Sequence, residues 1–229
     1  LCNLVENGSF EKSINNNNVV SFPGWEAISG ATISSVDSLN GQYWGSTVVK
    51  VESSNTQYSG LLSKPIKIIP QNKARIFVLS AKVYLPNDNN PDWVLDRHSY
   101  TGSCDSNCHK YTWGSNAIGS YGGNPIISTN DTAKKWLTKT VLIKTQENSD
   151  TLGVGVVVTS SNKGDNIIYV DDVRITELPS TLSDDQALAI AGVGYANICP
   201  ANESSCTAFR DPALTNQTYY YRYPIIAAI

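Results

Sequence analysis

The sequence predicts an all-β protein whose strands form two packed antiparallel sheets, and three observations support this fold class. Short runs of alternating apolar and polar residues dominate the first 178 residues, where helical spacing is almost absent. Clusters of Gly, Pro, Asn and Asp separate these runs, as in residues 21–24, 70–72 and 162–165. Hydrophobic residues make up 41% and charged residues 16% of the chain, a composition typical of extracellular domains.

The length of 229 residues suits one all-β domain followed by a structured tail. We expect the sandwich to span residues 1–178 and the tail to span residues 179–229. The net charge of −3 and the absence of a basic run argue against a nucleic-acid partner. No stretch of the chain approaches the ~20 apolar residues that a membrane-spanning helix needs.

Three features predict a secreted protein. The chain begins with Leu1 and contains no Met, so we expect that a signal peptide has been removed. The cysteines suggest two small disulfides, Cys104 with Cys108 and Cys199 with Cys206, while Cys2 pairs with another chain or redistributes the pairing. Four glycosylation sequons are the third feature, at Asn7, Asn130, Asn202 and Asn216.

Period-two patterns predict the individual strands. In residues 76–85, Phe77, Leu79 and Val83 fall on one face, and Ser80 and Lys82 fall on the other. Residues 137–145 repeat this pattern, with apolar residues inward and threonines outward. We expect further strands over residues 47–52, 60–69, 152–159 and 167–178. Short, half-apolar strands at this spacing predict two sheets packed face to face.

Residues 86–132 interrupt the pattern, and we interpret them as a long polar insertion loop rich in Gly and Asn. The insertion contains both histidines, His98 and His109, beside Cys104 and Cys108. In a secreted chain two cysteines so close together are more often a disulfide than half of a zinc site. We therefore expect a disulfide-stapled loop and no zinc.

The tail has its own signals. Pro179 ends the last sandwich strand, and the capping box that begins at Ser183 predicts a short helix that stops at Gly192. An extended final strand follows, with one wholly apolar or aromatic face. Such a face needs cover, either as an edge strand of its own sandwich or as a strand inserted into a neighbouring copy. We call it the assembly strand, and its residues are Tyr219, Tyr221, Tyr223, Ile225, Ala227 and Ile229.

The two ends of the sandwich carry motifs of a known family. Residues 4–11 read LVENGSFE and are followed by Trp25, and residues 168–175 read IYVDDVRI. Both motifs resemble the first and last strands of carbohydrate-binding modules attached to xylanases and cellulases. The resemblance covers residues 3–178 and implies a jelly roll of the galactose-binding-like type.

The resemblance also implies a structural calcium ion, because acidic residues of the first and last strands commonly hold one in this family. Glu11 and one of Asp171 or Asp172 would supply carboxylate oxygens, with backbone carbonyls and water completing a shell of about 6–8 oxygens. The alternative is that these three acids are solvated surface residues.

Sugar recognition in such modules uses aromatic rings against the apolar face of a sugar, with hydrogen-bonding groups around them. An alternative role for the aromatics of the insertion is to pin that loop to the sandwich. Trp25 and Trp136 lie beside core strands, and we interpret both as core residues. The candidate sugar contacts are Tyr43, Trp44, Trp93, Tyr100, Tyr111 and Trp113.

Two functions fit these features. The apolar final strand favours an extracellular structural subunit that polymerises head to tail with copies of itself and carries glycans at its sequons. The alternative is a carbohydrate-binding module or adhesin that recognises a polysaccharide through exposed aromatics. We expect no enzymatic activity, because the sequence lacks a GxSxG elbow, an HExxH helix and a P-loop.

Overall fold

The computed structural model describes residues 3–16, 19–37, 39, 47–54, 58–88, 92–101, 126–127, 134–158, 166–179, 206–210 and 218–222. Within these ranges the chain forms fifteen β-strands and no helix, so the predicted all-β class is confirmed for this part of the chain. Consequently, no described helix is long and apolar enough to cross a membrane.

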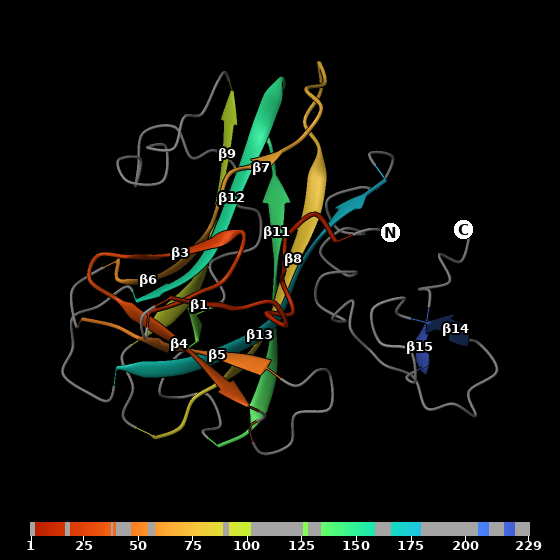
Figure 1. Cartoon of the computed structure of the whole chain (residues 1–229). Helices are drawn as coiled ribbons and strands as arrows, with labels where there is room; N and C mark the ends of the chain where they lie inside the picture. Colours follow the sequence, from red (N-terminus) through yellow and green to blue (C-terminus); the bar gives the residue numbers. More distant parts are fainter. Residues whose placement is uncertain are drawn as a thin grey trace.

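Two antiparallel sheets face each other across the core (Figure 1). The first, which we call the β8 sheet, has the strand order β11-β8-β13-β5-β4. Its strands are β4 (Thr32–Asp37), β5 (Thr47–Glu52), β8 (Ile76–Tyr84), β11 (Trp136–Lys144) and β13 (Ile167–Leu178).

The second sheet, which we call the β12 sheet, has the order β10-β9-β12-β6-β3, and β7 also pairs with β12. Its strands are β3 (Trp25–Ile28), β6 (Gly60–Ser63), β7 (Ile66–Lys67), β9 (Trp93–Thr101), β10 (Ile126–Ile127) and β12 (Ser149–Val158). A separate hairpin of β1 (Ile14–Asn16) and β2 (Val19–Ser21) exposes Ile14 and Val19.

The core lies between the sheets and follows the period-two alternation of the strands. Phe77, Leu79 and Val83 of β8 pack inward against alternate residues of β12, including Val154 and Val156. An aromatic group closes one end of the core, where Phe10 lies 5.0 Å from Trp25 and 5.6 Å from Phe22 between ring centroids. Trp25 is 4% exposed, so its prediction as a core residue is confirmed.

The structure places a strand in each predicted range, although residues 60–69 form two strands, β6 and β7, and it corrects the predicted insertion. Strands β5 and β13 have the predicted bounds, and β8, β11 and β12 differ from the predicted bounds by at most three residues. Residues 86–132 are not one loop, however, because β9 is a nine-residue strand next to β12. Its inward face carries Trp93, Leu95 and Arg97. Burial lowers the pKa of Arg97. The polar residues next to Arg97 in the sequence hide the apolar–polar alternation of β9.

Strand β13 contains a bulge that determines which of its residues face the core. Asp171 lies opposite Lys82 of β8, but Arg174 lies opposite Ser80, so β13 has one extra residue between them. Asp172 occupies this step with a φ of 48°. Ile168 and Val170 face the core before the bulge, and Val173 and Ile175 face it afterwards.

The N-terminal segment hydrogen-bonds to the backbone of β13 beyond the residues of β13 that pair with β5. Pairing with β5 ends at Val170. From there the Val173 N–H donates to the Gly8 carbonyl at 2.8 Å, and the Leu4 N–H donates to the Ile175 carbonyl at 3.1 Å. The Asn3 side chain bridges the two, accepting from the Ile175 N–H at 2.9 Å and donating to the Val173 carbonyl at 2.9 Å.

Gly8 is required by this close approach. A methyl group on Gly8 would overlap the Val173 carbonyl oxygen, which is part of the backbone and cannot move aside easily. We therefore expect Gly8→Ala to lower the free energy of unfolding by about 1–3 kcal/mol. Urea unfolding measures this loss, and Ser9→Ala, at the exposed neighbouring position, should leave stability unchanged. Equal stabilities of the two variants would contradict the prediction.

An ion pair joins the start of β8 to the end of β13. The Arg75 Nε and Nη2 atoms donate to the two carboxylate oxygens of Glu177, each at 2.7 Å, and Nη1 donates to the Ile69 carbonyl at 2.6 Å. The hydrogen bonds from Arg75 lower the pKa of Glu177 below its ordinary value, with Lys73 adding to the effect and burial opposing it. The Arg75 guanidinium also lies 5.0 Å from the centre of the Phe77 ring.

This ion pair predicts a pH-dependent contribution to stability. Because the folded pKa of Glu177 lies below the ordinary 4.5, its stabilisation is present above pH 4.5 and is lost as pH falls through the folded pKa. The Glu177 side chain is 39% exposed, so solvent screening limits its contribution to about 0.5–1 kcal/mol. Urea unfolding should show Glu177→Gln weaker than wild type at neutral pH and closer to it in acid. The exposed Glu147→Gln control should not differ from wild type at either pH.

The described part of the tail is a hairpin of β14 (Cys206–Arg210) and β15 (Thr218–Arg222). Tyr219 and Tyr221 of the assembly strand are paired within their own chain, opposite Phe209 and Thr207. The other four residues of the assembly strand, the predicted helix and the expected loop before Cys206 lie outside the described residues. Nothing in the described ranges supports head-to-tail polymerisation, which stays a prediction, as does a domain boundary after β13.

Candidate functional site

Three aromatic residues lie side by side on the outer face of the β8 sheet. Trp136 of β11 is opposite Tyr84 of β8, and Tyr84 is opposite Tyr169 of β13. All three point away from the core, because their neighbours along each strand, such as Leu137, Val83 and Val170, pack into it. We call Trp136, Tyr84 and Tyr169 the aromatic row.

The rings of the aromatic row contact one another, and those of Trp136 and Tyr169 remain partly open to solvent. The Trp136 and Tyr84 ring centroids are 5.6 Å apart with a 52° tilt, and those of Tyr84 and Tyr169 are 6.0 Å apart and nearly perpendicular. Tyr84 is 8% exposed, while Trp136 and Tyr169 are half-buried. Aromatic groups gathered on an outer face are typical of an interaction site, because elsewhere such side chains enter the core.

The same register continues across the sheet into polar residues. Tyr169 is opposite Lys50 of β5, and Lys50 is opposite Ser34 of β4, the edge strand. The Lys50 Nζ atom lies 2.9 Å from the Glu52 carboxylate, and both side chains are partly exposed. The aromatic row therefore has hydrogen-bonding side chains at its β5 end.

A charged cluster lies next to the aromatic row on the same outer face, two residues away along β8 and β11. Lys82 lies two residues before Tyr84, and its Nζ atom donates to the Thr138 hydroxyl at 2.6 Å. Burial lowers the pKa of Lys82, while Asp172 and Asp171 oppose this effect and Arg174 adds to it. Arg174 itself pairs with Asp172 at 2.6 Å. Rings bordered by donors and acceptors form the kind of surface that can bind a sugar.

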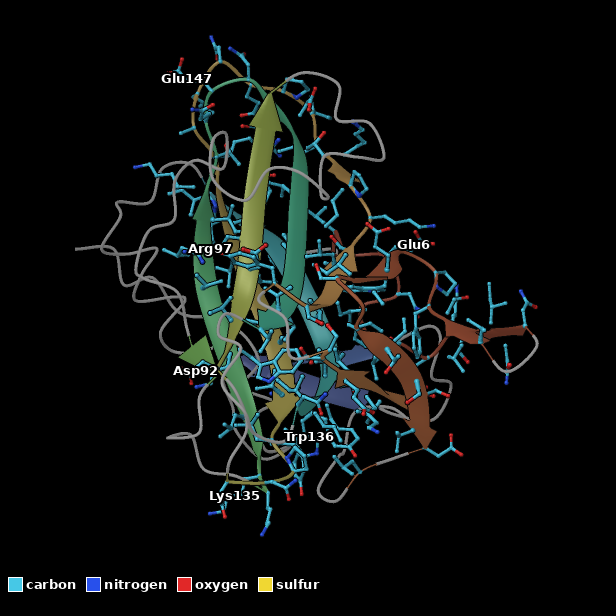
Figure 2. All side chains as sticks on the ribbon, turned by 90° about the vertical axis from the view of Figure 1, so that its left-hand side faces the viewer. Glu6, Asp92, Arg97, Lys135, Trp136 and Glu147 are labelled. Carbon is cyan, nitrogen blue, oxygen red and sulfur yellow. The ribbon has the colours of Figure 1, made fainter. Side chains whose placement is uncertain are left out.

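The outer face of the β12 sheet carries buried apolar residues, as does the outer face of the β8 sheet away from the aromatic row, where Val78, Leu142 and Leu178 are buried. On the β12 sheet, Leu62, Val94 and Val157 form a second buried apolar cluster, with exposures of 4% or less. Strand β12 is buried along nearly its whole length, on both of its faces. Figure 2 views the molecule from this side and shows Arg97 at the middle of β9. Of the two outer faces, the β8 sheet thus presents the more accessible described aromatics.

The predicted sugar contacts and the aromatic row are different residues. Trp93 is fully buried in the core and has no ring face to offer, which corrects its assignment as a sugar contact. The assignment of Trp136 to the core is also wrong, because the residue lies on the outer face. The backbone of Tyr100 lies in β9 opposite Thr151. Tyr43, Trp44, Tyr111 and Trp113 lie outside the described residues.

The three predicted calcium ligands all lie in the described part of the chain, and each has a hydrogen-bond or ion-pair partner there. Glu11 is exposed and accepts a hydrogen bond from the Thr47 N–H at 3.2 Å. Asp171 is buried and accepts from the Asp172 N–H at 2.6 Å, and Asp172 pairs with Arg174. Among the described side chains, no group of three His, Cys, Asp or Glu residues could hold a metal ion. Structural calcium therefore stays a prediction.

Of the four sequons, only that of Asn7 lies in the described ranges. The Asn7 amide donates to the Lys12 carbonyl at 2.8 Å and accepts from the Lys12 N–H at 3.1 Å. Asn130, Asn202 and Asn216 lie outside the described residues, as do Cys2, Cys104, Cys108 and Cys199, so neither disulfide is tested.

Comparisons with known proteins show the fold and no closer relationship. No family model and no curated protein matches the sequence. An arabinose-bound α-L-arabinofuranosidase matches 76% of this chain with a TM-score of 0.54 and 10% identity, and the chain spans only 26% of that enzyme. A cyclase from Fischerella sp. TAU matches 78% of this chain and 98% of its own, with a TM-score of 0.51 and 14% identity.

The similar structures include carbohydrate-binding modules, the family that the terminal motifs resemble. The CBM22-1 xylan-binding domain of Paenibacillus barcinonensis Xyn10C has a TM-score of 0.48 and 14% identity, covering 76% of this chain and 94% of that domain. At these identities the similarity concerns the fold alone. The β-sandwich predicted from the sequence is confirmed by the two packed antiparallel sheets of the structure.

The different placements of the two tryptophans predict different losses of stability. Trp93→Ala should lower the free energy of unfolding by about 3–5 kcal/mol, because it empties a fully buried site. Trp93→Phe should cost much less, since the buried indole N–H has no hydrogen-bond partner to lose. Trp136→Ala should cost less than Trp93→Ala. Urea unfolding tests this order, and a larger loss for Trp136→Ala would contradict it.

Proposed function

We propose that this protein is a non-catalytic carbohydrate-binding module that binds a glycan on the outer face of the β8 sheet. The observation that carries the proposal is the aromatic row, in which Trp136, Tyr84 and Tyr169 occupy matching positions on three adjacent strands. The C–H groups on one face of a sugar ring pack well against the electron-rich face of an aromatic ring. A row of such rings suits a ligand made of several sugar units.

The geometry of the row supports binding to an extended chain. Adjacent strands lie ~4.8 Å apart, so the register from Trp136 through Tyr169 and Lys50 to Ser34 crosses four spacings, or about 19 Å. Aromatic rings occupy one part of this path and polar side chains the other. A glycan lying across the strands would meet stacking surfaces first and hydrogen-bonding groups beyond them.

The row is held by the sheet rather than by loops. Tyr84 and Tyr169 lie inside long strands whose hydrogen bonds fix their positions, and each ring is further restrained by its neighbours. Side chains positioned before the ligand arrives lose little freedom on binding, which favours affinity. Lys82 and Thr138, already joined by a hydrogen bond, would orient the sugar hydroxyl groups.

The proposed ligand suits a protein that acts outside the cell, where structural polysaccharides are found. The sequons and the closely spaced cysteines support this location. We include secretion in the proposal on these sequence features.

The test is retention on polysaccharide gels in affinity electrophoresis, surveyed over a panel of soluble polysaccharides. Trp136→Ala and Tyr169→Ala should each weaken binding by roughly 5- to 100-fold, because each removes a stacking surface worth about 1–3 kcal/mol, as measured for base–aromatic stacking. The matched control is Ile69→Ala, which removes a side chain that is 78% exposed and lies away from the row.

Thermal unfolding of each variant separates lost binding from lost structure. A wild-type protein that is retained by no polysaccharide would refute the proposal. Retention that survives in the Trp136→Ala and Tyr169→Ala double variant would place the glycan site elsewhere on the chain.

A further inference from the structure

The edge of the β8 sheet beside Trp136 is basic. Strand β11 and the two residues before it carry four lysines and no acidic residue between positions 134 and 144. This contrasts with the chain as a whole, which has a net charge of −3. The four residues are Lys134, Lys135, Lys139 and Lys144.

Protection of the sheet edge explains only part of this charge. Lysines on an edge strand discourage pairing with another chain, and β11 is an edge strand of its sheet. This explanation fits Lys139 and Lys144, which lie within the paired part of the strand. Lys134 and Lys135 precede the paired residues, so protection of the edge does not require them.

Lys134 and Lys135 are held in place next to the aromatic row. The Lys134 N–H donates to the Leu85 carbonyl at 2.8 Å, and Lys134 has a φ of 59°, so the backbone is fixed as β11 begins. Both lysine side chains are exposed, and Lys135 directly precedes Trp136. Figure 2 shows Lys135 and Trp136 close together at the same end of the sandwich.

Other cations near the row are already matched by carboxylates. Lys50 pairs with Glu52, and Arg174 pairs with Asp172. In contrast, no carboxylate among the described residues forms an ion pair with Lys134 or Lys135. The first acidic residue after β8 along the chain is the exposed Asp88, three residues beyond Leu85.

We infer that the ligand of the aromatic row is an acidic glycan, whose carboxylate or sulfate groups bind Lys134 and Lys135 while a sugar ring stacks on Trp136. This inference rests on the proposed function and specifies its ligand class. A stacking surface flanked by two exposed ammonium groups favours a sugar chain that carries negative charge at intervals. Lysine interacts with such groups as a point charge, so both carboxylate and sulfate fit.

Matched pairs of polysaccharides test the inference directly. Polygalacturonate is compared with its methyl ester, and dextran sulfate with dextran, so that each pair differs in charge on a common backbone and the two pairs distinguish carboxylate from sulfate. The wild-type protein should bind the charged member of at least one pair more tightly. Binding should weaken as salt is added, because the lysines are exposed to solvent.

The variants assign that preference to the two lysines. A Lys134→Gln and Lys135→Gln double variant should lose roughly 2- to 30-fold in affinity for the acidic polysaccharide, since each exposed pair contributes about 0.2–1 kcal/mol. The Lys134→Arg and Lys135→Arg variant should retain binding. The control, Lys12→Gln with Lys64→Gln, makes the same change in net charge at exposed positions elsewhere and should bind like wild type.

The possible failures are distinguishable. Equal or tighter binding of the neutral polysaccharides, still dependent on Trp136, would overturn the acidic ligand and leave the proposed function standing. An equal loss in the control double variant would show only a general charge effect and would also overturn the inference. Retention of no glycan at all, or of a single-stranded oligonucleotide instead, would overturn both proposals.

Discussion

The bulge in β13 is the constraint on which the rest of the β8 sheet depends. Side chains alternate strictly along a strand, so without an extra residue either Ile168 and Val170 or Val173 and Ile175 would face solvent. The bulge lets both pairs reach the core, and it keeps Tyr169 on the outer face opposite Tyr84. The backbone groups after the bulge are satisfied by the N-terminal segment, so the first residues of the chain stabilise the last strand of the sandwich.

This arrangement connects stability to the candidate site. The aromatic row exists because three strands present matching outward positions, and β8, the middle one, is fixed between two long partners. The Glu177–Arg75 ion pair adds to the backbone pairing where β13 ends beside the start of β8. The same sheet therefore supplies half of the core on one face and a preorganised aromatic surface on the other.

Much of the fold could be predicted from the sequence, because apolar alternation is strong where one face of a strand is buried. The bounds of β5 and β13 followed directly from this pattern. Strand β9 is not predicted, because Asp96, Arg97 and His98 interrupt the apolar run. A charged residue such as Arg97 at an inward position suggests a loop rather than a strand. Strands β3 and β4 were missed for a related reason, since short and partly exposed strands bury few side chains.

The site was less predictable than the fold, although one signal was present. Leu137, Val141 and Ile143 were correctly expected to face inward, and the same alternation places Trp136 outward. Trp136 is nevertheless interpreted from the sequence as core, because it lies beside a core strand. Trp93 was misassigned for the opposite reason, since polar neighbours in the sequence concealed a position at the centre of the molecule. That Tyr84, Tyr169 and Trp136 meet depends on strand register, which connects residues far apart in the chain and leaves no local pattern.

Affinity and selectivity would come from different parts of the proposed surface. Stacking on aromatic rings is tolerant of sugar identity, because pyranose rings generally present C–H groups, so the aromatic row alone would bind many glycans weakly. Charge at the rim contributes more to the choice of partner than to the strength of binding, and it acts at longer range. Tyr84 and Tyr169 lie on central strands, whereas Trp136 and the two exposed lysines lie at the sheet edge, so these roles are only partly separated in space. The rigid part of the fold then holds two of the three rings, and the solvent-exposed edge, where substitutions cost little stability, determines which glycan is selected.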